Sequence, residues 1–89
     1  MADFIHAREH LQKGDIVVVE SSHQCNVCLT TDAEFSKYKS GRKFRHYGGF
    51  ARIFPARIVV PHAANWNITL DLGGGRANIQ YSISYIKQP

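Results

Sequence analysis

The sequence predicts an all-β fold with one short helix. The fold is either an antiparallel β-sandwich, of which the jelly roll is one form, or a pseudo-β-prism-like barrel. Apolar and polar residues alternate over 66–72 and 77–85, as in strands that have one packed face and one solvated face. Helical spacing and capping residues occur together at 31–41. With 89 residues, the chain has room for a single domain, which we expect to span residues 1–89.

The two clearest predicted strands lie in the C-terminal third and alternate in register. The residues expected to face the core are Trp66, Ile68, Leu70, Ile79, Tyr81 and Ile83. The residues expected to face solvent are Thr69, Asp71, Asn78, Gln80 and Ser82. Because the glycines at 73–75 separate the two strands and glycine tolerates positive φ, the pattern predicts a tight hairpin.

Other strands follow from β-branched runs and alternation. Residues 15–20 are apolar on both faces, which predicts a central strand covered from two sides. Residues 24–30 alternate so that Cys25 faces the core and Cys28 faces solvent. Prolines flank 56–60 and favour a strand at a sheet edge, whereas 50–54 is a weaker strand candidate.

The helix prediction rests on a capping box. Thr31 and Glu34 have the capping-box spacing, Phe35 and Tyr38 lie on one face, and Gly41 is suited to end the helix. Residues 1–13 fit either a loose helical pattern or an extended edge strand, so the sequence leaves both open.

Nearly the whole chain contributes to a set of motifs, which are His23-Gln24-Cys25-Asn26-Val27, Tyr47-Gly48-Gly49, Phe54-Pro55-Ala56, Val60-Pro61, Trp66-Asn67 and Asp71-Leu72-Gly73-Gly74-Gly75, together with Phe35 and Tyr38. In these motifs the chain resembles the bacterial domain-of-unknown-function family number 1883. The resemblance implies an all-β sandwich or pseudo-β-prism that occurs alone or joined to a TIR domain. It implies no known activity, and it offers no catalytic residues to carry over to this chain.

The most informative functional feature is a basic stretch from Lys37 to Arg57 that contains no acidic residue and has aromatic residues between its cations. Such a stretch can follow a phosphate backbone and stack bases, or bind an acidic glycan or protein. The binding candidates are Arg42, Lys43, Arg45, His46, Tyr47 and Arg52. We expect Arg42, Lys43 and Arg45 on an exposed loop before a turn at 47–49. The alternative is a solvated charged face with Phe44 and Tyr47 in the core.

Metal and catalytic chemistry have little support in the sequence. Cys25 and Cys28 are three residues apart on a predicted strand, so their thiols point to opposite faces and cannot share a metal ion unless a turn or bulge replaces the strand. The histidines lack a nucleophile elbow or a paired-carboxylate motif beside them. The sequence therefore predicts no catalytic residue, no metal and no cofactor.

The predicted function is a non-enzymatic binding or interaction module, such as a sensor or adaptor, with an unidentified protein or small-molecule partner. The first alternative is polyanion binding through the Lys37–Arg57 stretch, and the second is a small enzyme. The longest apolar run, 16–19, is far shorter than the roughly 18–20 residues of a membrane span. Because residues 1–6 also lack the features of a secretory signal, we expect a cytoplasmic protein.

Overall fold

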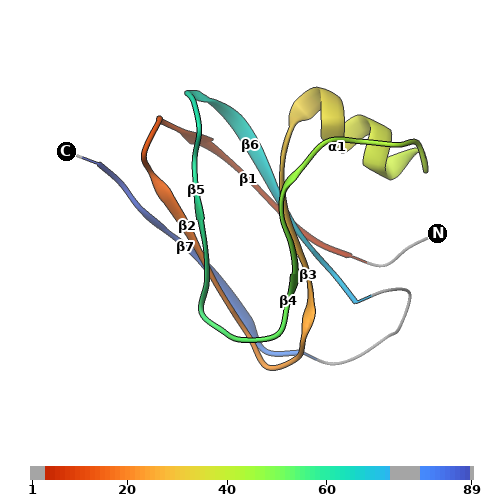
Figure 1. Ribbon diagram of the computed structural model, residues 1–89, viewed down its shortest axis with the longest axis vertical. Coiled ribbons are helices and arrows are strands. Elements are labelled where there is room, and N and C mark those ends of the chain that lie inside the picture. Colours follow the sequence, from red (N-terminus) through yellow and green to blue (C-terminus); the bar gives the residue numbers. More distant parts are fainter. Residues whose placement is uncertain (1–3, 73–78, 89) are drawn as a thin grey trace.

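The computed structural model describes residues 4–72 and 79–88, which form seven strands and one helix (Figure 1). The elements in chain order are β1 (Phe4–Leu11), β2 (Ile16–Ser21), β3 (Cys25–Thr31), α1 (Asp32–Lys39), β4 (Tyr47–Ala51), β5 (Ala56–Val59), β6 (Ala64–Asp71) and β7 (Tyr81–Ile86). This confirms the predicted all-β class with one short helix. The helix begins as expected, because the Thr31 side chain accepts a hydrogen bond from the Glu34 amide.

The strands form a sandwich of two antiparallel sheets. One sheet has the order β1-β6-β3-β4, and the other has the order β5-β2-β7. Successive strands lie in different sheets at every connection except the one between β3 and β4, which contains α1. The chain thus crosses repeatedly between the layers, and most of its strand pairings are long-range (Figure 1).

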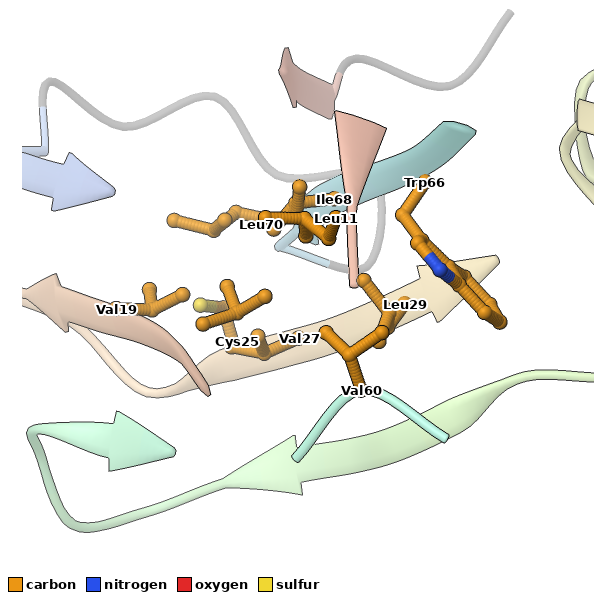
Figure 2. Packing of buried hydrophobic residues seen from close by; sticks show 10 residues of the cluster. Leu11, Val19, Cys25, Val27, Leu29, Val60, Trp66, Ile68 and Leu70 are labelled. Carbon is orange, nitrogen blue, oxygen red and sulfur yellow. The ribbon is translucent and has the colours of Figure 1, made fainter. Parts of the chain in front are cut away.

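The core lies between the two sheets and consists of the inward-facing side chains of their strands. Figure 2 shows these side chains converging from separate strands, among them Leu11 of β1, Leu29 of β3 and Ile68 of β6. The fully buried apolar residues are Leu11, Val17, Val19, Cys25, Val27, Leu29, Val60, Trp66, Ile68 and Leu70. The predicted inward face of β6 is therefore confirmed.

The predicted hairpin between the two C-terminal strands is wrong. Strand β6 pairs with β1 and β3, whereas β7 pairs with β2 in the opposite sheet. Alternation fixes which face of a strand is buried, but it does not fix which strand is the neighbour. The glycines at 73–75, and Asn78 with them, lie outside the described residues.

Strand β7 is less buried than its alternation predicts. Ile79 and Ile83 are half-buried, while Gln80 and Ser82 are exposed as expected. Tyr81, which was expected in the core, is 51% exposed. The physical reason is position, because Tyr81 begins a strand at the edge of the smaller sheet, where few neighbours surround it.

On the outer side of the four-stranded sheet, α1 packs against β3 and β6, which overturns predicted exposures on both strands. Cys28 and Thr69 were expected in solvent, yet they are only 7% and 2% exposed, and Thr30 and Asn67 of the same alternating patterns are 2% and 1% exposed. All four lie on the side of the sheet that faces α1, where Phe35 of the helix is itself buried. The face of β3 and β6 beneath the helix is thus a second packing layer, in which buried polar side chains lie near the Phe35 ring.

Strand β2 has the central position predicted for it, with β5 and β7 on either side. Only its inward residues are fully buried, however, and Ile16 and Val18 on the other face are half-buried. Beside them on the same face, Val59 is 62% exposed and Ile86 is 49% exposed. Within the described residues no helix lies on this face, so the expectation of a strand covered from two sides was wrong.

Two further segments differ from the sequence patterns. The ambiguous N-terminal segment is an edge strand, β1. The expected turn at 47–49 and the weak strand at 50–54 give way to β4, which runs from Tyr47 to Ala51. Gly48 allows this because it has a φ of +93°, and a Cβ there would lie 2.3 Å from the carbonyl oxygen of Val27. The expected edge position of the proline-flanked strand, β5, is confirmed.

We expect the substitution Ile68→Ala to lower the free energy of unfolding by about 2–4 kcal/mol, because it leaves a cavity in the centre of the core. Ile53, which is 84% exposed, provides the matched control, and Ile53→Ala should change the stability little. Urea unfolding followed by circular dichroism measures both. Equal midpoints for the two variants would contradict the assignment of the core.

We expect both thiols to react slowly with a thiol reagent in the native protein and fast in urea. Burial raises the pKa of Cys25 and of Cys28, and the thiolate is the reactive form. Absorbance of the released chromophore measures the rate. Rapid labelling of one thiol per native chain would show that α1 does not cover Cys28.

Candidate functional site

Five of the six predicted binding residues lie close together in the chain, where α1 leads into β4. Arg42, Lys43, Arg45 and His46 are exposed in the connection of residues 40–46, here called the basic loop, and Tyr47 is the first residue of β4. This is the loop placement expected for the three cations. In Figure 1 the basic loop runs back from the end of α1 toward the four-stranded sheet.

Arg52, the sixth predicted residue, lies apart from the others. It follows the opposite end of β4, where its guanidinium is 5.7 Å from the centre of the Phe50 ring. The sequence could not separate Arg52 from the loop cations, because it did not show that the intervening residues are an extended strand.

The basic loop is attached to α1 by hydrogen bonds at both of its ends. After the helix, the Arg42 amide donates to the Lys37 carbonyl oxygen at 2.9 Å. Further along, the Arg45 amide donates to Oε1 of Glu34 at 2.6 Å, and Lys37 Nζ donates to Oε2 of the same carboxylate at 2.9 Å. The Arg45 amide, followed by Lys37, holds the pKa of Glu34 below its ordinary value.

An aromatic cluster holds the middle of the loop against the helix. Phe44 packs edge-on against Tyr38 with 5.1 Å between ring centres, and it also contacts the His46 ring at 5.2 Å. Tyr38 is anchored in turn, because its hydroxyl donates to the Asp71 carboxylate. Burial and this bond raise the pKa of Tyr38. Phe44 therefore packs against the helix, but it is half-buried and lies outside the core. Tyr47 is 47% exposed, so the alternative interpretation, which placed both rings in the core, was wrong.

Two hollows lie beside the basic loop and share Glu34 and Arg45. The first has a volume of about 310 Å³, and Lys37, Lys43 and Phe44 complete its lining. Its surface is mainly cationic, with three basic side chains around one carboxylate. We call it the cationic hollow.

The second hollow, of about 150 Å³, has aromatic walls and is called the aromatic hollow. Besides the shared Glu34 and Arg45 it is lined by Leu29, Thr30, Thr31, Tyr47, His62 and Trp66. The Trp66 ring lies 5.9 Å from the Tyr47 ring and 5.0 Å from the His62 ring. The indole is held in place, because its Nε1 donates to the His62 carbonyl oxygen at 3.0 Å.

Three residues beside the basic loop were not predicted from the sequence as site residues: Glu34, His62 and Trp66. The pattern placed Glu34 in a helix cap and Trp66 in the core, and both placements are correct. Their role beside the basic loop depends on β6 lying next to β3, and alternation alone does not show this pairing. The capping box does not indicate the contact of Glu34 with the loop, because that motif directs the carboxylate back to the Thr31 amide, whereas it accepts from the Arg45 amide.

Within residues 4–72 and 79–88, no three histidine, cysteine, aspartate or glutamate side chains lie close enough to hold a metal ion. Cys25 is in the core between the sheets and Cys28 is under α1, so the two thiols lie on opposite faces of β3 as predicted. In the same part of the chain, no helix has the length and apolar character needed to cross a bilayer.

The fold and this site define a class of protein, a two-sheet β-sandwich that carries a cation-rich loop beside its single described helix. The chain belongs to the family described as Domain of unknown function (DUF1883), whose model matches residues 2–89. The family resemblance is thereby confirmed. No curated protein and no solved structure matches the chain.

We expect the NMR signal of the Arg45 amide to titrate with a midpoint below pH 4.5, the ordinary pKa of a glutamate carboxyl. Because the folded-state pKa of Glu34 is lowered, the hydrogen bond from Arg45 is intact above 4.5 and weakens as the pH falls through the lower value. The variant Glu34→Gln is the control and should not show this titration. A midpoint above 4.5 would contradict the described attachment of the loop.

Proposed function

We propose that this protein is a non-enzymatic binding module that recognises anionic groups through its basic loop. The proposal rests on the exposure of Arg42 and Lys43 and on their lack of an ion-pair partner among the described residues. Both side chains are exposed, and in the part of the chain that the structure describes neither has a carboxylate partner. Unpaired exposed cations beside an ordered scaffold are suited to contact phosphate or sulfate groups.

The proposed partner is a polyanion, either a nucleic acid or an acidic glycan. Both present repeating anionic groups, and the net charge of +4 favours their approach. The basic loop is already held in place by its hydrogen bond to Glu34 and by the contact of Phe44 with Tyr38. Binding would therefore cost little conformational entropy in the loop. A protein or small-molecule ligand is the interpretation that remains if no polyanion binds.

We place this activity in the cytoplasm. The family resemblance adds a bacterial setting in which the module acts alone or next to a TIR domain as a sensor or adaptor.

The test is the salt dependence of binding to a fluorescent single-stranded oligonucleotide and to fluorescent heparin, measured by anisotropy. The double variant Arg42→Gln with Lys43→Gln should bind both more weakly at low salt. For the oligonucleotide, the slope of log affinity against log salt should flatten by about 1.4, since each lost phosphate contact removes about 0.7 for a single strand. Stability should change little, because both residues are exposed.

The matched control removes the same charge elsewhere, with Lys13→Gln and Lys87→Gln on exposed positions outside the Lys37–Arg57 stretch. This variant should retain the wild-type affinity and slope. Equal weakening by both double variants would show that net charge alone attracts polyanions. Absence of binding by the wild-type protein to either probe at low salt would contradict the proposal.

A further inference from the structure

The cationic hollow and the aromatic hollow form one continuous surface. They share the side chains of Glu34 and Arg45, so a ligand in one lies directly beside the other. Because Lys37 is paired with Glu34, Lys43 and Arg45 supply the cationic side chains that remain available there within the described residues. The surface is therefore divided into a half that attracts anions and a half with ring walls.

The aromatic half offers accessible rings on a fixed support. Tyr47 is 47% exposed and His62 is exposed, while Trp66 behind them is fully buried. Exposed rings held by a buried one can stack on a flat ligand without much loss of side-chain freedom. A flexible, charged glycan has no flat aromatic ring to use this wall.

Glu34 makes the two hollows differ in the charge of the ligand group that each one favours. Its carboxylate lines both hollows, and its pKa is held low, so it is negatively charged at neutral pH. An anionic group is repelled from the small aromatic hollow, where Arg45 is the only lysine or arginine among the described lining residues, and is favoured beside Lys43. The ligand that fits must have its anion next to a planar ring, and it must place the ring against Tyr47.

We propose that these two hollows bind one nucleotide unit of a single-stranded nucleic acid, with the phosphate beside Lys43 and Arg45 and the base against Tyr47 and His62. The inference rests on the proposed function and narrows its partner class. A duplex is excluded because its bases are already stacked and their faces are covered. Since every base has a flat face, the site should tolerate different sequences.

The test compares three probes: oligothymidylate, a sugar-phosphate strand of the same length without bases, and heparin. Tyr47→Ala should weaken the binding of oligothymidylate about tenfold, the expected loss for one stacked base. It should leave the binding of the base-free strand and of heparin unchanged. Tyr47→Phe retains the ring and should bind like the wild type.

Tyr81→Ala is the matched control, because Tyr81 is 51% exposed on β7 of the other sheet. This variant should bind all three probes like the wild type. The base-free strand provides a second measurement that needs no variant, and it should bind the wild type about tenfold more weakly than oligothymidylate. The single tryptophan, Trp66, adds a direct signal, since oligothymidylate should change its fluorescence and the base-free strand should not.

The outcomes separate this inference from the proposed function. If heparin and both strands bind with equal affinity, and Tyr47→Ala behaves like Tyr81→Ala, the basic loop binds polyanions but the nucleotide site is wrong. If heparin alone binds, the partner is a glycan and the nucleotide site is again wrong. If no probe binds the wild type, both proposals fail.

Discussion

The arrangement of the molecule depends on Asn67, a buried amide on the outer face of the larger sheet. Asn67 is 1% exposed, and its side-chain nitrogen donates to Oδ1 of Asp32 at 2.8 Å and to the Thr30 carbonyl oxygen at 3.4 Å. Its oxygen accepts from Nε2 of His6 at 2.8 Å. One amide thus joins β1, β3, β6 and the first turn of α1, and it keeps its polar groups paired where water is excluded.

This network determines where the candidate site lies. Asp32 is also held by a paired contact with Arg8, which with Asn67 keeps its pKa low and fixes the start of the helix. With the start of α1 fixed, Glu34 lies between the two hollows and holds the basic loop at its Arg45 amide. The position of the loop cations therefore depends on contacts that begin in the sheet and pass through α1. A displacement of the helix would move these cations together.

Much of the fold could be predicted from the sequence, because alternation and capping are local properties. The core face of β6, the capped helix and the opposite orientation of Cys25 and Cys28 follow from such patterns. The neighbour of each strand and the covering of polar faces are long-range properties, so the hairpin and the exposure of Cys28 were predicted wrongly. For the same reason the basic loop was visible in the sequence, whereas its combination with His62 and Trp66 was not.

Under this proposal, the ligand of the protein binds where the basic loop meets the aromatic hollow. The most direct measurement is a map of amide and indole NMR signals during addition of unlabelled single-stranded oligonucleotide. The expected result is a continuous set of shifted signals that spans residues 34–47, His62 and the indole of Trp66. Shifts gathered instead on the uncovered face of the smaller sheet, around Ile16, would contradict the claim.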